Sequence, residues 1–254
     1  MLYSTMLPAS AQLITDVEKC FRSKDTESAG YDFSKCKDVF KFMNEDRKQC
    51  DAQWIEETAF PGNFINKGRI RKILDIGCGI GTVTINVAKY FPEAEVIGVD
   101  IDEFAIKTAN KNKEEQNVEN VTFYQMDAGK LKEEWTKRFD WITMFTVLHD
   151  LPDPDSCVQE ILRVVCNDGI VTFIDPLCHS DPRLNIGNEI LAASLTISCF
   201  VCLPCSHSAP PYAGNGLGWG FENRAKYIKG FCLKILTNET QKVIHCTKQK
   251  TETE

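Results

Sequence analysis

The chain has 254 residues, of which 43% are hydrophobic and 26% are charged, a composition typical of a globular protein. The net charge of −7 and the lack of a basic stripe exclude a general nucleic-acid partner, because phosphate contacts need clustered lysine and arginine. Twelve cysteines, mostly inside apolar segments, predict reduced buried thiols and a cytoplasmic location instead of a disulfide scaffold.

The longest apolar run, residues 190–205, is too short for a membrane-spanning helix, which needs roughly 20 apolar residues. Polar residues such as Ser194 interrupt it, and Pro204 lies near its end. We therefore predict a buried helix in this run and no contact with a membrane.

Residues 1–66 are predicted to form an N-terminal helical segment, since apolar residues such as Val39, Phe40 and Met43 recur at helical spacing. Pro61 and Gly62 then break the chain before the main domain, which we expect to span residues 67–254.

From residue 71 onward, short apolar strands alternate with helices. Strands are predicted at 72–76, 95–99, 121–124, 141–145 and 170–174, and helices at 82–90, 103–115 and 155–165. This alternation is typical of a parallel sheet with helices on both faces.

The C-terminal part departs from that alternation. It contains a helical insert at about 184–205, a helix at 222–229, and two strands at 232–236 and 242–246. The link between these two strands is too short for a parallel crossover, so they must form a hairpin. The predicted fold class is α/β, with a doubly wound, mostly parallel seven-stranded sheet and an antiparallel last strand.

A glycine-rich turn, Asp75-Ile76-Gly77-Cys78-Gly79-Ile80-Gly81, joins the first predicted strand to the first helix. Glycines let the backbone turn sharply and approach a ligand, and the free N–H groups of the helix start suit an anion such as a carboxylate. In the nicotinamide-cofactor fingerprint the third glycine comes three residues after the second, whereas Gly81 follows Gly79 by two.

Three acids follow the ends of the first three strands. Asp75 ends the first, Asp100 ends the second, and Asp127 comes just after the third. Because parallel strands end at the same edge of a sheet, these acids are expected to face one crevice, with Asp100 on ribose hydroxyls and Asp127 on an adenine amino group. Each alone could be a loop acid or a helix cap, but all three in these places favour a nucleoside site.

Over residues 70–248 these motifs resemble the class I S-adenosylmethionine-dependent methyltransferases. The resemblance implies S-adenosyl-L-methionine as cofactor. Its methionine part would lie on the glycine turn, and Ile101 would pack against its adenine. The backbone of Phe145 and Thr146 would lie near the amino group that the cofactor carries close to its methyl group. The cofactor-binding residues that it implies are Asp75, Gly77, Cys78, Gly79, Gly81, Asp100, Ile101, Asp127, Ala128, Phe145 and Thr146.

A narrower resemblance rests on His149-Asp150 and on the segments 215–220 and 31–33. It is to a subgroup of these methyltransferases that often carries an N-terminal winged-helix module. The first 66 residues are too few for that module, so it is truncated or absent here and its DNA-binding role is not expected. A homodimer is left open.

His149 is the predicted catalytic base, because imidazole titrates near neutral pH, and Asp150 orients it or acts alone. The alternatives are that both residues only shape their loop, or that methyl transfer needs no base. Trp219, in a glycine-flanked loop, either closes over the site or packs in the core.

Cys199, Cys202 and Cys205 have a spacing that can hold a metal, but they lie in or beside an apolar helix without the turn residues of a zinc knuckle. No metal is predicted.

The resulting prediction is a methyltransferase that acts on an oxygen or nitrogen of a small-molecule acceptor. Two alternatives stay open: a nicotinamide-dependent oxidoreductase, and a non-catalytic binding module of the same fold.

Overall fold

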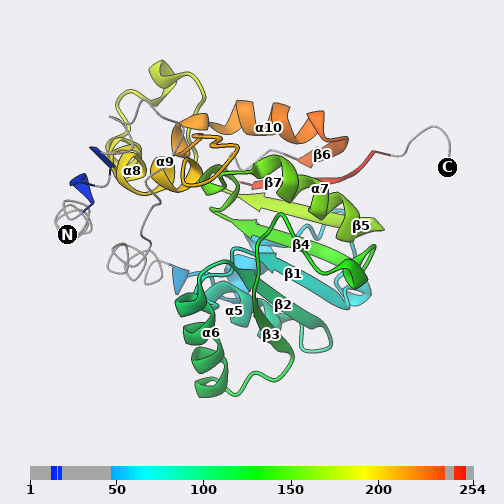
Figure 1. Cartoon of the computed structure of the whole chain (residues 1–254). Coiled ribbons are helices and arrows are strands. Elements are labelled where there is room, and N and C mark those ends of the chain that lie inside the picture. The colour runs from blue at the N-terminus through cyan, green and yellow to red at the C-terminus, as the bar shows by residue number, and fades with distance from the viewer. Residues whose placement is uncertain (1–12, 16, 19–46, 238–242, 250–254) are drawn as a thin grey trace. The chain divides into compact units, whose positions relative to one another are not determined.

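A computed structural model provides the structure of the chain (Figure 1). It describes residues 13–15, 17–18, 47–237 and 243–249.

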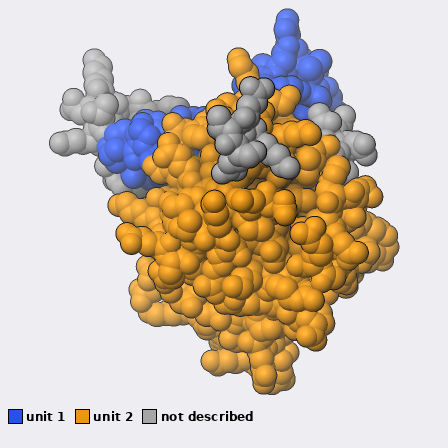
Figure 2. All heavy atoms as spheres, turned by 90° about the vertical axis from the view of Figure 1, so that its right-hand side faces the viewer, with its two compact units in different colours: residues 1–46, 148–154, 176–224 blue, residues 47–147, 155–175, 225–254 orange. Residues whose placement is uncertain are grey.

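The chain divides into two compact units (Figure 2). The sheet unit comprises residues 47–147, 155–175 and 225–254, and the helical unit comprises residues 1–46, 148–154 and 176–224.

The sheet unit contains seven strands in the order β3-β2-β1-β4-β5-β7-β6 (Figure 1). Strands β1 to β5 pair in parallel, and β7 pairs antiparallel with both β5 and β6. The predicted fold class and the C-terminal hairpin are therefore confirmed. The strands are β1 (Lys72–Ile76), β2 (Glu95–Asp100), β3 (Val121–Gln125), β4 (Phe139–Phe145), β5 (Val165–Ile174), β6 (Leu233–Thr237) and β7 (Val243–Lys248).

The helices between the strands follow the predicted bounds closely. Helices α5 (Thr82–Tyr90) and α6 (Glu103–Glu115) begin and end where the sequence predicts, and both pack against β2 and β3. The remaining two are α7 (Pro154–Val164) and α10 (Phe221–Gly230). Asp102 caps α6 by accepting a hydrogen bond from the Phe104 N–H.

Strand β5 begins earlier than predicted. Phe139 of β4 pairs with Val165, and after an irregularity Trp141 pairs with Ile170. The polar residues 166–169 suggest a turn in the sequence, but in the structure they belong to the irregular start of this strand.

The core of the sheet unit is apolar and contains an aromatic cluster. Phe60, Phe91 and Trp141 meet edge to face, with ring centroids 5.3 to 5.7 Å apart. Ile73, Leu74 and Ile76 of β1 are all fully buried, as expected for a strand covered on both faces.

Most of the predicted N-terminal helical segment, residues 1–66, lies outside the described residues. Its described part includes α4 (Ala52–Trp54) and a π-helix (Ile55–Ala59), and Ile55 and Phe60 belong to the core of the sheet unit. The division into domains at residue 67 stays a prediction.

The helical unit contains the predicted insert as two helices, α8 (Glu189–Phe200) and α9 (Cys202–Ser206). Pro204 explains the break, because its ring would clash with the Phe200 carbonyl four residues earlier in one continuous helix.

The prediction of a buried helix at 190–205 is correct only in part, because Pro204 and Cys205 of α9 are buried whereas most of α8 is not. Within α8 only Leu191 and Ser198 are buried, and Ile190 is 71% exposed. Leu191 packs with Cys178 and Leu217 in a small cluster of the helical unit. The apolar residues of α8 are spread around the helix, so a single packed face cannot cover them. No helix in the described ranges has the length and apolar character to cross a bilayer.

A buried hydrogen-bond chain in the sheet unit predicts how stability depends on pH. The Trp141 indole N–H donates to Thr172 Oγ1 (2.9 Å), and Thr172 Oγ1 lies 2.9 Å from His245 Nδ1. The Thr172 hydroxyl can donate its proton to Nδ1 when the His245 ring is neutral. Burial lowers the pKa of His245 to about 4.

The unfolded chain, with a histidine pKa near 6.5, binds a proton that the folded chain excludes between about pH 4 and 6.5. The free energy of unfolding should therefore fall by about 3 kcal/mol as the pH drops through this window. Urea denaturation of the chain and of His245→Leu, from pH 7 to 4.5, measures this. The variant should show a flatter profile, and parallel profiles would contradict the assignment.

Candidate active site

The glycine turn between β1 and α5 is fixed by close packing. A Cβ at Gly77 would lie 2.3 Å from Val147 Cγ2, and one at Gly81 would lie 2.7 Å from Phe123 Cζ. Both residues have positive φ, so only glycine fits there. The Gly77 and Cys78 N–H groups donate to the Val99 carbonyl (2.8 and 3.0 Å), which ties the turn to the end of β2.

Asp75, at the start of this turn, is buried and internally bonded. Its two carboxylate oxygens accept from the hydroxyls of Thr84 on α5 (2.5 Å) and Thr143 on β4 (2.8 Å). Burial raises the pKa of Asp75, against the opposing effect of these hydrogen bonds. Asp75 thus holds β1, β4 and the start of α5 together beneath the turn.

Asp100 joins the end of β2 to the glycine turn. Its Oδ2 accepts from the Gly79 N–H (2.8 Å) and its Oδ1 from the Asp102 N–H (2.9 Å). Burial raises the pKa of Asp100, partly offset by these two backbone donors. A carboxylate has about four acceptor positions, so Asp100 keeps capacity for further donors such as hydroxyls.

Arg47 places a cation over the same turn, which the sequence analysis missed. Its guanidinium nitrogen Nη1 lies 3.7 Å from the position of a Cβ at Gly79, and Nη2 donates to Thr146 Oγ1 (2.6 Å). The guanidinium carbon also lies 5.1 Å from the centre of the Phe145 ring. Arg47 thereby connects the end of β4 to the turn after β1.

Phe145 and Thr146, predicted to border the cofactor, lie at the end of β4. Thr146 has φ +57°, an uncommon conformation for a β-branched residue, and its N–H donates to the Ile174 carbonyl (2.7 Å). Such strain is often found at functional sites. Phe145 packs edge to face against Trp54, with ring centroids 5.5 Å apart.

The predicted adenine residues lie at the ends of β2 and β3. The Met126 N–H donates to the Asp100 carbonyl (2.8 Å), which brings the segment before Asp127 against the end of β2. Asp127 is exposed, Ala128 is half-buried, and Ile101 is 61% exposed. An exposed aliphatic side chain beside two acids provides an apolar surface for a planar ring.

Cys78 differs from its neighbours in the turn. Its side chain is buried in the core of the sheet unit, where burial, with help from Asp100 and Asp75, raises its pKa well above the usual value. Only its backbone can contribute to a ligand site at the turn.

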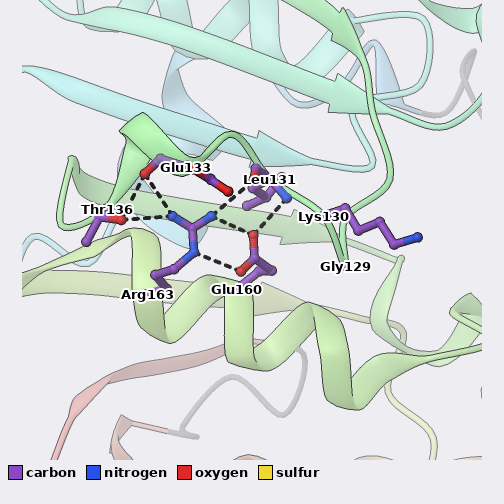
Figure 3. Close-up of a pocket in the computed structure, with 7 residues that line it drawn as sticks. All are labelled: Gly129, Lys130, Leu131, Glu133, Thr136, Glu160 and Arg163. Atoms are coloured by element: carbon purple, nitrogen blue, oxygen red, sulfur yellow. Dashed lines mark hydrogen bonds and ion pairs between the residues drawn. The ribbon is translucent and has the colours of Figure 1, made fainter.

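A polar hollow of about 410 Å³ lies beside the loop that follows Asp127 (Figure 3). Arg163 on α7 lines this hollow and bonds to other groups of the protein. It pairs with Glu160 (2.6 Å) and donates to the carbonyls of Leu131, Lys132 and Glu133. Glu160 in turn accepts from the Leu131 N–H (2.7 Å). Because these groups form hydrogen bonds with one another, we interpret Arg163 and Glu160 as a clamp that holds the loop, and the hollow beside them is not interpreted as a ligand pocket.

His149 and Asp150, the predicted catalytic pair, belong to the helical unit. They lie in a 3₁₀ turn (Leu148–Asp150), with His149 Nε2 3.2 Å from Asp150 Oδ1. Cys202 of α9 completes a group in which the three side chains approach within 4.8 Å of one another. Cys199 and Cys205, which share a metal-compatible spacing with Cys202, do not join this group among the described residues.

Trp219 belongs to a 3₁₀ turn (Leu217–Trp219) of the helical unit. It is half-buried, and its carbonyl accepts from the Ser180 hydroxyl (2.9 Å). Trp219 is therefore not fully buried, and both alternatives, closing over the site and packing in the core, stay predictions.

Comparison with known proteins identifies the family. Residues 69–200, just over half of the chain, match the model of the methyltransferase domain family. The chain belongs to this family. S-adenosylmethionine is the methyl donor of its class, and no comparison supports the oxidoreductase alternative.

Relatives with curated names match part of the chain. The ubiquinone biosynthesis O-methyltransferase of Acinetobacter baumannii is 30% identical over 120 residues, 47% of each chain. That of Pseudomonas fluorescens is 35% identical over 132 residues, 47% of this chain and 56% of the relative. The chain spans about half the length of the curated relatives it matches.

Among solved structures, a candidate O-methyltransferase from Nostoc punctiforme aligns with 97% of this chain and 72% of its own, with a TM-score of 0.66 and 19% identity. This likeness supports the fold.

The clamp of Arg163 and Glu160 should affect the cofactor through the loop after Asp127. Arg163→Met removes the donors to that loop, so the affinity for S-adenosylmethionine should fall roughly tenfold, the equivalent of about one hydrogen bond. Isothermal calorimetry measures this. Arg138→Met is the matched control, because Arg138 pairs with Glu95 at the opposite end of β2. Equal affinities of both variants would contradict a positioning role for Arg163.

Proposed function

We propose that this chain transfers the methyl group of S-adenosylmethionine to an oxygen or nitrogen of a small-molecule acceptor. The observation that carries the proposal is that Arg47 and Asp100 both lie at Gly79: the Arg47 guanidinium is 3.7 Å from the position of a Cβ there, and Asp100 accepts from the Gly79 N–H. One turn thereby has a cation for a carboxylate and an anion for hydroxyl groups. S-adenosylmethionine carries a carboxylate on its methionine part and two hydroxyl groups on its ribose, and its sulfonium centre joins the two parts.

The residues of the sheet unit fit the parts of this cofactor. Arg47 can bind its carboxylate in a charge-assisted pair, together with free N–H groups at the start of α5. Asp100 has acceptor capacity for both ribose hydroxyls. Ile101 and Phe104, 61% and 54% exposed, offer an apolar surface to the adenine, and Asp127 would accept from its amino group.

S-adenosylmethionine supplies a methyl group on a sulfonium, which is already a strong electrophile. The chain therefore mainly has to hold the reactants in line and exclude water. We assign removal of the acceptor proton to His149, with Asp150 orienting the ring, since Nε2 and Oδ1 lie 3.2 Å apart.

The relatives favour oxygen as the acceptor atom. The curated proteins named above are O-methyltransferases of ubiquinone biosynthesis. We therefore put hydroxylated aromatic acceptors first among the small molecules to be tested.

We further propose a cytoplasmic location and no nucleic-acid partner. No disulfide joins the ten cysteines in the described part of the chain, which suits a reducing compartment. The net charge of −7 disfavours phosphate-rich partners. Light scattering would establish whether two copies associate.

Loss of either charge at the turn should weaken cofactor binding. Arg47→Met and Asp100→Asn should each lower the affinity for S-adenosylmethionine by about 10- to 100-fold, because each removes a charged hydrogen bond worth about 1.5–3 kcal/mol. Calorimetry with S-adenosylmethionine, its demethylated product and NAD measures this.

Arg69→Met is the control, since Arg69 lies before β1 and its side chain is exposed. Absence of heat from S-adenosylmethionine and its product with folded wild-type chain would overturn the proposal. Heat from NAD alone would favour the oxidoreductase.

Replacement of the proposed base should reduce turnover without affecting the cofactor. His149→Gln should lower kcat by about 10²- to 10⁴-fold, the usual contribution of a general base, at unchanged cofactor affinity. Release of demethylated product against a panel of phenols measures turnover. Unchanged kcat would indicate transfer by proximity alone, and no turnover with any acceptor by the wild type would favour the non-catalytic module.

A further inference from the structure

The helical unit contains one group of side chains with the chemistry of a metal site. One ring nitrogen of His149, one carboxylate oxygen of Asp150 and Cys202 Sγ all lie within 4.8 Å of one another. Two of the residues lie in the 3₁₀ turn Leu148–Asp150 and the third begins α9. We propose that His149, Asp150 and Cys202 bind a divalent cation of zinc-like character.

The donor set selects the class of ion. Imidazole and thiolate favour zinc and related transition metals, whereas magnesium and calcium prefer oxygen ligands alone. A thiolate and a carboxylate together offset the two positive charges, and the thiol proton passes to solvent on binding. The ion and its three ligands would therefore have no net charge, which suits their partly buried position.

The spacing of the donors suits tetrahedral coordination. Two ligands at 2.0–2.2 Å from a tetrahedral zinc lie about 3.4 Å apart, and His149 Nε2 and Asp150 Oδ1 lie 3.2 Å apart. Nitrogen and sulfur ligands would lie about 3.5 Å apart. Cys202 Sγ lies within 4.8 Å of the candidate ligand atoms of the other two residues, so metal binding would draw it closer to them.

The segments that carry the ligands are held by further hydrogen bonds. The His149 carbonyl accepts from the Gly216 N–H (3.0 Å), and the Pro152 carbonyl accepts from the Ala213 N–H (3.1 Å). Ser198, beside Cys202, accepts from the Leu217 N–H (2.9 Å). One loop thus fixes both ligand-bearing segments, as required for a preorganised site.

The burial of the cluster is also appropriate. The His149 side chain is 3% exposed, while Asp150 and Cys202 are half-buried, so an ion could enter and remain shielded. Three protein ligands leave a fourth position open, which is the pattern of zinc sites that bind water or substrate.

An ion here changes the role of His149. A metal on Nε2 would take the place of the Nε2 proton through which Asp150 orients the proposed base, so in a loaded chain the ion would lower the pKa of a coordinated acceptor hydroxyl instead. This consequence rests on the proposed function, whereas the metal site itself does not.

The test uses the full chain, stripped with a chelator and titrated with Co²⁺, followed by displacement with Zn²⁺. We expect one equivalent of Co²⁺ to bind and to give a thiolate-to-cobalt charge-transfer band. Cys202→Ser should abolish the band and weaken Zn²⁺ binding at least 100-fold, and Asp150→Asn should weaken it at least tenfold. Circular dichroism verifies that each variant is folded.

Cys199→Ser is the matched control, since Cys199 is exposed on α8 three residues before Cys202. It should keep the band and the affinity. A folded wild-type chain without the band, a band that survives Cys202→Ser, or a band lost in Cys199→Ser would each overturn the proposal. Calorimetry with S-adenosylmethionine on the same samples separates failure of this site from failure of the proposed function.

Discussion

One carboxylate holds the site of the sheet unit together. Asp100 accepts from Gly79 in the turn after β1 and from Asp102 at the start of α6, so the ends of two strands and the start of a helix share one acceptor. The close contacts of Gly77 and Gly81 leave no room for a side chain at either position of this turn. The direction of α5, and with it the free N–H groups at its start, follows from that junction.

The charges around the turn are arranged in a compensating set. Burial raises the pKa of Asp75 and of Asp100, and the positive charge of Arg47 acts in the opposite direction on the pKa of both acids. Arg47 is itself anchored by Thr146 at the end of β4. A ligand that carries a carboxylate and a diol would complete this set, which is why the site suits an adenosyl amino acid better than a neutral molecule.

Local patterns predicted the sheet and the turn, because strand periodicity, glycine spacing and strand-end acids are encoded in short segments. Arg47 could not be found in that way: it lies far from the motifs in sequence, and only the tertiary structure brings it to Gly79 and Thr146. Composition likewise suggested a buried helix at 190–205, whereas Ile190 is largely exposed. Burial depends on which neighbours a helix has, and one sequence segment does not contain that information. The cluster of His149, Asp150 and Cys202 was missed for the same reason, since spacing along the sequence groups Cys202 with Cys199 and Cys205 and not with the distant His149 and Asp150.

Thr146 illustrates a conflict between folding and ligand recognition. A β-branched residue at φ +57° costs free energy that glycine or asparagine at this position would largely recover. The branched side chain that causes this cost also carries the hydroxyl that accepts a hydrogen bond from the guanidinium of Arg47. Selection for stability alone would therefore replace this threonine. If a population evolving under selection for activity keeps it, the hydrogen bond to Arg47 is needed for function.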